Sequence, residues 1–332
     1  MTQSQTTQTA SRPPNVEKRL PIQPLHSDIR SIQPGGGVCM RIELAWGTLR
    51  RWYLKTFRPS YVVRMRGTRR GEPHGCPHEV LDPRDLKYHR NQTECRWDEK
   101  DDPFVWRDRL PFARVGLAEL ILLSGACLTL AVIIGLVFWP AALVVLGLSL
   151  FVAWFFRNPS RDIPQAPGLV VSPADGKVVA VEDVAHDEFI GGPAIVIGIF
   201  LSVFNVHINR VPVAGRIIGL QYRKGKFLNA LRAASTRENE QMMMQLEEDG
   251  VPHRRIIVRQ IAGAIARRIV CWVAPGERLD RGSQFGMIKL GSRTELVLPQ
   301  EEGLSVLVRV GDRVRAGSSV VVKYPSDTNH HE

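Results

Sequence analysis

The chain has 332 residues and a formal net charge of +11, with 44 Lys and Arg against 33 Asp and Glu. This length allows two domains or one large one, and the basic balance favours an anionic partner. No groove-reading motif or interleaved aromatic platform accompanies the charge, so nucleic-acid binding is not expected.

Residues 1–109 open with the polar stretch MTQSQTTQTASRPPN and continue without sustained periodicity. We predict a largely disordered basic extension with a short helix near residues 41–57. Residues 1–114 hold 21 basic and 13 acidic side chains, and such an arm beside a hydrophobic segment suits anionic lipid head groups. No signal peptide is expected, and the rest of the chain should stand without this extension.

The five cysteines are scattered and odd in number, which predicts no disulfide framework and fits a reducing compartment. Four residues could be imagined as zinc ligands: Cys76, His78, His89 and Cys95. Their spacing, C-x-H-x10-H-x5-C, matches no familiar zinc pattern, so no metal site is predicted.

Residues 120–156 contain no charged side chain. Each half, on either side of Trp139-Pro140, has about the ~17–20 residues that a helix needs to cross ~30 Å of hydrocarbon. We predict a hydrophobic helical hairpin within residues 110–157, associated with the membrane. Basic residues flank both ends, which places the ends on the cytoplasmic face of the cell membrane. A pair of helices buried in a soluble protein is the alternative.

Residues 158–332 consist of short β-branched runs separated by turn signals such as Asp175-Gly176 and Gly311-Asp312. This texture predicts a mainly β (α+β) catalytic domain, an antiparallel β-sandwich or barrel, with one helical interlude over residues 238–249. The tail, residues 307–322, resembles half of a biotinyl/lipoyl-type hairpin barrel. A non-enzymatic membrane-anchored adaptor with a lipoyl-like barrel is therefore the alternative function, although no heptad run is present.

Several short motifs in this β-rich part occur in a fixed order. They are FRNP at 156–159, SPADGK at 172–177, NVHINR at 205–210, GKFLNA at 225–230 and KLGSRTELVLP at 289–299. Together they resemble the short, bacterial and archaeal-type class of phosphatidylserine decarboxylase proenzymes, over residues 110–323. The resemblance implies that the bond between Gly291 and Ser292 cleaves itself and that Ser292 becomes an N-terminal pyruvoyl group.

The residue chemistry agrees with this resemblance. Decarboxylation of an amino acid needs an electron sink conjugated to its amine, and no motif suggests a pyridoxal-binding lysine. A pyruvoyl carbonyl would serve by forming a Schiff base with the substrate. Ser292 can generate it: Oγ attacks the preceding carbonyl, the ester undergoes β-elimination, and dehydroalanine hydrolyses to pyruvoyl and ammonia. Gly291 leaves that carbonyl unobstructed and tolerates a strained backbone.

Serine is a weak nucleophile and needs a base that a third group orients. His207 is the candidate base, and Asp175 is the candidate orienter or proton acceptor. In the longer bacterial class the corresponding strand carries a second histidine, and an Asp-His-Ser triad uses it; here that position is Arg210. His207 could therefore act in self-cleavage or in decarboxylation. Arg210 could hold the lipid phosphate or be a surface charge, and Asp175 could simply favour its turn.

These observations predict a self-processing decarboxylase that converts phosphatidylserine in anionic membranes to phosphatidylethanolamine and CO2. Cleavage would leave a β-chain of residues 1–291 and an α-chain of 41 residues (332 − 291), paired as a heterodimer. This heterodimer could also assemble into a higher oligomer.

Overall fold

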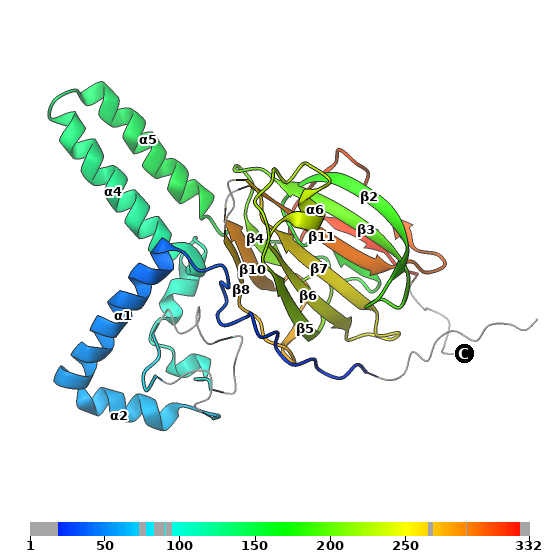
Figure 1. Ribbon diagram of the computed structural model, residues 1–332, viewed down its shortest axis with the longest axis horizontal. Coiled ribbons are helices and arrows are strands. Elements are labelled where there is room, and N and C mark those ends of the chain that lie inside the picture. The colour runs from blue at the N-terminus through cyan, green and yellow to red at the C-terminus, as the bar shows by residue number, and fades with distance from the viewer. Residues whose placement is uncertain are drawn as a thin grey trace, which may run out of the picture.

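The protein is described here by a computed structural model that covers residues 19–72, 78–82, 90, 95–264, 268–289 and 291–325. A group of helices and a β-domain meet at one junction (Figure 1). The helical segments are α1 (Val38–Phe57), α2 (Pro59–Thr68), η2 (Glu99–Asp101), η3 (Val105–Arg109), η4 (Arg114–Gly116), α4 (Leu117–Gly135), α5 (Trp139–Phe155) and α6 (Ser235–Glu238).

The N-terminal extension holds more regular structure than the sequence predicted. The helix expected near residues 41–57 is present as α1, and α2 follows it directly. The two helices and the segment after them bury a small apolar cluster: Leu54, Val62, Met65, Val80 and Leu81. Its members come from three separate segments, so no single helical period in the sequence revealed the cluster.

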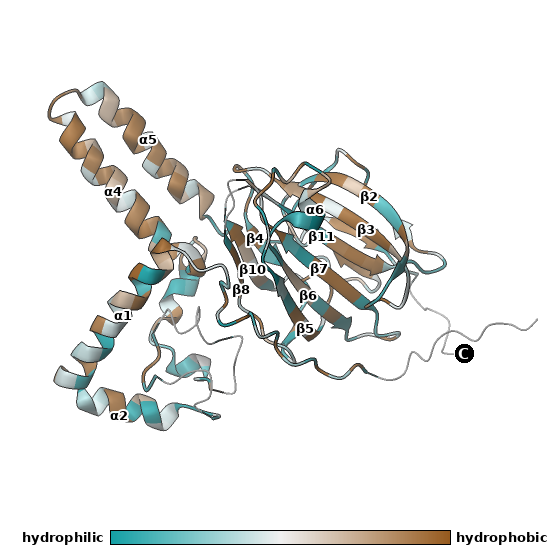
Figure 2. Cartoon of the chain, viewed as in Figure 1, coloured by the Kyte–Doolittle hydropathy of each residue, from teal (hydrophilic) through white to brown (hydrophobic). Residues whose placement is uncertain are grey.

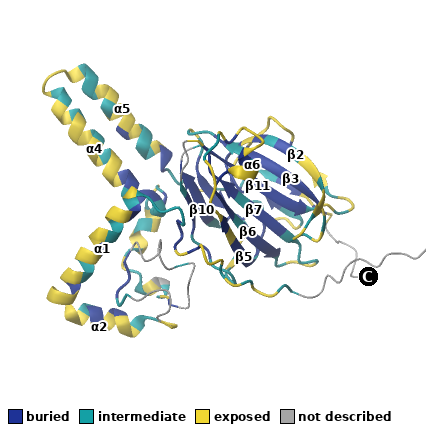
Figure 3. Ribbon diagram, viewed as in Figure 1, coloured by how far each residue is buried: buried dark blue, intermediate teal, exposed yellow. Residues whose placement is uncertain are grey.

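Helices α4 and α5 form the predicted hairpin and turn at residues 136–138. Both are hydrophobic and largely exposed along their length (Figures 2 and 3). Val137, at the turn, is 89% exposed, and Val132 is 65% exposed. Within the described residues, one helix, Arg114–Gly135, is long and apolar enough to cross a membrane, whereas α5 has 17 residues. The hairpin is therefore compatible with membrane association.

The β-domain is mainly antiparallel, as the sequence predicted, and is built from three sheets. The largest has the order β13-β2-β3-β11-β7-β6-β5-β9, and two three-stranded sheets have the orders β4-β10-β8 and β1-β14-β12. The strands are β1 (Leu169–Val171), β2 (Gly176–Asp187), β3 (Gly192–Leu201), β4 (Ile208–Arg210), β5 (Gly215–Arg223), β6 (Gln241–Glu248), β7 (Arg255–Ile261), β8 (Arg268–Cys271), β9 (Arg278–Leu279), β10 (Gln284–Lys289), β11 (Ser292–Pro299), β12 (Ser305–Val306), β13 (Arg313–Val314) and β14 (Val320–Lys323).

The predicted helix over residues 238–249 is wrong, because this segment forms strand β6. Its Met, Gln, Leu and Glu residues favour a helix when considered alone. However, β6 lies between β5 and β7 and pairs with both along its whole length. Backbone pairing on two sides and burial of Met242, Met244 and Leu246 outweigh the local preference.

An extended segment before α1, residues 19–36, runs along the β-domain. Two backbone hydrogen bonds join it to the β-domain. Gln23 N donates to Ile218 O at 2.8 Å, and Cys271 N donates to Ile32 O at 2.8 Å. Ile29 and Ile32 are buried. This segment therefore packs on the β-domain, and the prediction that the rest of the chain stands without the extension stays a prediction.

The base of the hairpin packs on the sheet β4-β10-β8. One apolar cluster joins Ile32 of the extended segment, Leu117, Leu120 and Phe155 of the hairpin, and Ile208 and Met287 of that sheet. The two ends of the hairpin are also tied by their backbones, since Ala113 N donates to Phe156 O at 2.8 Å. The hairpin is thus anchored beside strand β10, which leads into the Gly291-Ser292 turn.

Candidate active site

Gly291 and Ser292 lie where the chain passes from one sheet to another. Strand β10 belongs to the sheet β4-β10-β8, and β11, which starts at Ser292, is central in the eight-stranded sheet. Gly291 has a φ of +60°, in the left-handed region that glycine adopts without cost. A residue with a side chain rarely adopts this conformation, so the turn favours glycine at position 291.

The Ser292 side chain is fully buried, and its Oγ has no hydrogen-bond partner among the residues that the structure describes. A buried hydroxyl normally finds a partner, because an unsatisfied one costs about 1–3 kcal/mol. An unengaged Oγ beside a glycine in the left-handed region is available to react with the adjoining carbonyl.

The carbonyl of Gly291 faces Gly263. A Cβ built on Gly263 would lie 2.1 Å from Gly291 O, well inside contact distance. Gly263 therefore leaves the space that the Gly291 oxygen occupies.

His207 reaches the same turn from the loop before β4. Its Nε2 accepts from Gly291 N at 3.3 Å, and its Nδ1 contacts Asn205 O at 2.9 Å. A carbonyl oxygen can only accept, so Nδ1 carries the proton and Nε2 presents its lone pair to the turn.

The His207 ring is buried against Phe155, with ring centroids 4.5 Å apart. Burial lowers the pKa of His207 from 6.5 to about 4, the Asn205 carbonyl opposes this shift, and the nearby Arg157 charge adds to it. His207 is therefore a neutral base at physiological pH.

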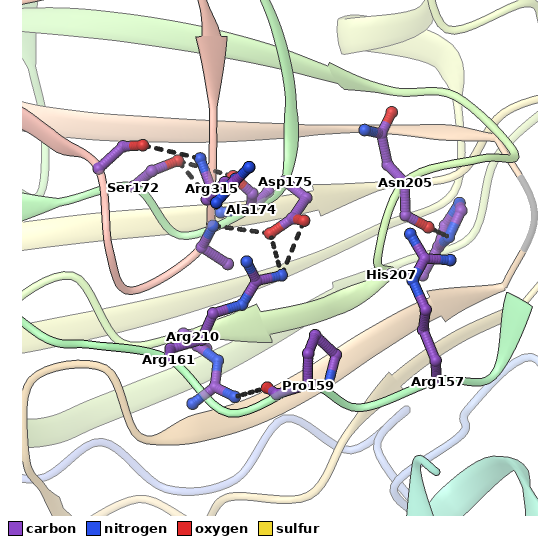
Figure 4. Close-up of polar contacts among 12 residues, drawn as sticks. Arg157, Pro159, Arg161, Ser172, Ala174, Asp175, Asn205, His207, Arg210 and Arg315 are labelled. Carbon is purple, nitrogen blue, oxygen red and sulfur yellow. Dashed lines mark hydrogen bonds and ion pairs between the residues drawn. The ribbon is translucent and has the colours of Figure 1, made fainter. Parts of the chain in front are cut away.

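Asp175 binds groups other than His207 in the structure. Its carboxylate accepts from Arg161 Nη2 at 2.8 and 3.0 Å and from Ala316 N at 2.8 Å, and the figure shows this group apart from His207 (Figure 4). The predicted contact is replaced because His207 satisfies both ring nitrogens with backbone groups. Asp175 still lies toward the same end of the sheet, since Lys177 of β2 and Arg293 of β11 both pair with Phe200.

Arg210 is buried and binds backbone carbonyls. It donates to Gly282 O at 2.9 Å. It also donates to Pro159 O at 3.4 Å, as Figure 4 shows. Burial lowers its pKa most, the Arg161 charge lowers it further, and the Asp175 charge raises it. The surface position considered for Arg210 is excluded by its 8% exposure.

A cavity of ≈ 390 Å³ opens between the hairpin base, the start of α1 and the end of β10. Leu123, Leu148 and Phe155 contribute apolar walls, and Arg268 and Lys289 contribute cationic groups. Phe155 also packs on His207, so one wall residue of the cavity contacts the histidine that reaches the Gly291-Ser292 turn.

The sequence profile of the phosphatidylserine decarboxylase family matches residues 148–322. The chain is 54% identical to the phosphatidylserine decarboxylase proenzyme of Rhodopirellula baltica, over 72% of this chain and 99% of that protein. It is 47% identical to the proenzyme of the same name from Symbiobacterium thermophilum, over 67% of this chain and 97% of the relative. The chain belongs to the phosphatidylserine decarboxylase family. The predicted resemblance is confirmed, and nothing in these comparisons supports the adaptor alternative.

A buried polar network lies behind the decarboxylase-family motifs and was not predicted from the sequence. Asn209 donates to Thr294 Oγ1 at 3.1 Å and accepts from Gln260 Nε2 at 2.9 Å, and all three residues are fully buried. Asn209 and Thr294 belong to the motifs NVHINR and KLGSRTELVLP, so the motifs already contained two of the three residues of the network. The network joins β4, β7 and β11 close to Ser292.

An ion pair beside the Gly291-Ser292 turn was also not predicted from the sequence. Lys289, at the end of β10, pairs with Glu119 in the first turn of α4 and donates to Gln33 Oε1 at 3.3 Å. These residues are far apart in the chain, and only the fold brings them together.

Of the residues considered as zinc ligands, Cys76 and His89 lie outside the described residues. Over the part of the chain that the structure describes, no group of three or more His, Cys, Asp or Glu could hold a metal ion.

Proposed function

We propose that this chain is a self-processing phosphatidylserine decarboxylase whose pyruvoyl group is made from Ser292. The observation that carries the proposal is the unengaged, buried Ser292 Oγ beside Gly291 in the left-handed conformation, with His207 Nε2 at the same turn. The names of the related proenzymes support both the substrate and the processing.

Self-cleavage uses groups of this chain and one water molecule. His207 Nε2 has to release the Gly291 N–H and turn its lone pair to Ser292 Oγ before it can take the hydroxyl proton. Oγ then attacks the Gly291 carbonyl carbon, the peptide C–N bond breaks and an ester forms. Loss of the Ser292 Cα proton expels the Gly291 carboxylate and leaves dehydroalanine. Water then replaces the nitrogen, which departs as ammonia. The two products together weigh the precursor plus H2O minus NH3.

The surroundings of Ser292 fit a pyruvoyl group at that position. Strand β11 pairs with β3 through Ser292 and Arg293 and with β7 through Arg293, so the new terminus would stay inside the sheet. A pyruvoyl carbonyl supplies the electron sink that decarboxylation of an amino acid requires. Ser292 itself is fully buried, and the fully buried side chains of Asn209, Thr294 and Gln260 lie on the strands around it.

We assign different roles to the two other predicted residues. Asp175 holds Arg161 and the backbone near Ala316 at the same end of the sheet, about two strand spacings (~10 Å) from Ser292. Arg210 braces the Pro159 and Gly282 backbones. Arg268, in the wall of the cavity beside the hairpin, is the better candidate for the lipid phosphate, with the apolar walls receiving the acyl part.

The hairpin would hold the site at the cytoplasmic face of the cell membrane, because its two ends meet at one base that carries Arg157 and Arg161. Cleaved α- and β-chains would stay together as a heterodimer, since β11 occupies the middle of the large sheet.

Intact-mass analysis of the purified protein tests this proposal. Wild type should show two chains, of 291 and 41 residues, with the smaller one NH3 lighter than a chain that begins with serine, and it should release CO2 from phosphatidylserine. Ser292→Ala should stay one inactive chain, whereas Ser305→Ala, an exposed serine on β12, should behave as wild type. An active, uncut wild type would overturn the proposal.

A further inference from the structure

The outer face of α1 carries a continuous apolar stripe. Its members are Val38 (62% exposed), Ile42 (47%), Trp46 (63%), Leu49 (53%), Tyr53 (47%) and Phe57 (61%). They recur at intervals of three and four residues, so they share one side of the helix. Trp52, 58% exposed, lies at the edge of this stripe.

The stripe is not the face by which α1 packs on the protein. Met40, Gly47 and Leu54 are buried and lie on the opposite side of the helix. Helix α1 is therefore held by one face and presents a second apolar face outward, which soluble surfaces avoid unless the patch binds something.

The stripe starts where the hairpin starts. Val38 lines the same cavity as Leu123 of α4 and Leu148 of α5. From this common base α1 and the hairpin run in clearly different directions (Figure 1). When the hairpin enters a bilayer, its base lies at the head-group level, and α1 extends from that level instead of following the hairpin inward.

The chemistry of α1 suits that level. Residues 38–68 carry seven Lys and Arg against one Glu, and Arg41 and Arg58 are exposed. Trp and Tyr favour the membrane–water interface because their rings are apolar and their N–H or O–H groups are polar. A helix with an aromatic apolar face and a basic remainder lies in the plane of anionic membranes.

We propose that α1 is an interfacial helix whose stripe, from Val38 to Phe57, lies in the head-group region of an anionic bilayer beside the hairpin. This surface lies outside the segment that matches the decarboxylase family profile, which begins at residue 148. The proposal rests on the proposed insertion of the hairpin, but not on the chemistry of Ser292.

Site-specific photo-crosslinking in vesicles tests the proposal. The photoreactive amino acid p-benzoylphenylalanine replaces Leu49 in the stripe, Val137 at the hairpin turn, or Ala185, which is exposed on β2, each in the full chain. We expect lipid adducts by mass at positions 49 and 137 and none at 185. Self-cleavage of each variant reports that it has folded, and position 42 replaces position 49 if that variant does not cleave.

Each outcome has one meaning. Lipid adducts at 137 without any at 49 overturn the proposal, and an adduct of position 49 to another copy of the chain makes the stripe a self-association surface instead. Absence of lipid at 137 refutes insertion of the hairpin, and the proposal falls with it, while normal CO2 release would leave the enzyme assignment intact.

A charge variant adds a functional measurement. Trp46→Glu combined with Leu49→Glu should lower the activity on vesicles of phosphatidylserine severalfold, yet leave the activity on detergent-dispersed phosphatidylserine unchanged. Thr48→Glu, an exposed position outside the stripe, adds negative charge to the same helix and should have a much smaller effect. Equal activity of the double variant and wild type on vesicles would contradict the proposal.

Discussion

His207 is kept neutral by its surroundings, and this determines how self-cleavage should depend on pH. Its folded pKa of about 4 lies below the ordinary value of 6.5, so the base form persists far into the acid range. We expect the cleavage rate of refolded precursor to stay level as pH falls through 6.5 and to decline only near pH 4. Between pH 6.5 and pH 4 the histidine takes up a proton in the unfolded chain but not in the folded one. The free energy of unfolding, which has its full value above pH 6.5, therefore decreases as pH falls through this range.

Substitution of His207 separates its two possible roles. His207→Ala should accumulate uncut precursor, because Ser292 loses the only base that contacts the turn among the described residues, with a rate loss of roughly 10²–10⁴-fold. His186→Ala, an exposed histidine on β2, is the matched control. A His207→Ala chain that cuts normally but releases no CO2 would assign the residue to decarboxylation.

Gly263 should be indispensable for self-cleavage. Gly263→Ala places a Cβ 2.1 Å from the Gly291 oxygen, so the scissile carbonyl has to move away from the position that Ser292 attacks. We expect precursor to accumulate while most of the β-domain stays folded, as measured by intact mass and circular dichroism. Gly250→Ala, where a Cβ meets nothing within 4 Å, should process normally. Full processing of the Gly263 variant would show that the turn has room to adjust.

At the scale of elements, α4 and β10 are joined by the buried pair Glu119 and Lys289, two residues before Gly291. Glu119→Gln leaves the Lys289 charge buried without its counter-ion, which typically costs about 3–5 kcal/mol. We expect a lower unfolding temperature in detergent and slower processing. Glu119→Leu combined with Lys289→Met should recover much of the stability, because no buried charge is left uncompensated. Stability equal to wild type in the single variant would mean that water reaches this pair.

At the scale of the whole molecule, the extended segment before α1 should be required for folding. Truncation to residue 19 keeps every described contact and should not change processing. Truncation to residue 38 removes the buried side chains of Ile29 and Ile32, whose burial contributes on the order of 3–6 kcal/mol together. We expect the shorter chain to unfold at a markedly lower temperature. Equal unfolding temperatures for the two truncations would show that this segment only lies on the surface.

The sequence by itself determined the class of protein and the hairpin, and it predicted the cleavage bond. These features follow from local signals that can be recognised without knowledge of the fold. They are the length of the uncharged segment, the β-branched runs and the ordered motifs around Gly291-Ser292. Strand β6 was not predicted because its residues favour a helix locally. Pairing with a strand on each side overrides that preference.

Only the tertiary structure decided which residues meet at the turn. The motifs suggested that Asp175 would orient His207, but pairing positions depend on how strands pack, and Arg161 holds that carboxylate instead. Gly263, Phe155 and the pair of Glu119 with Lys289 approach the turn from elements far apart in the chain. Contacts between distant segments follow from packing of the whole chain, and no local pattern in the sequence encodes them.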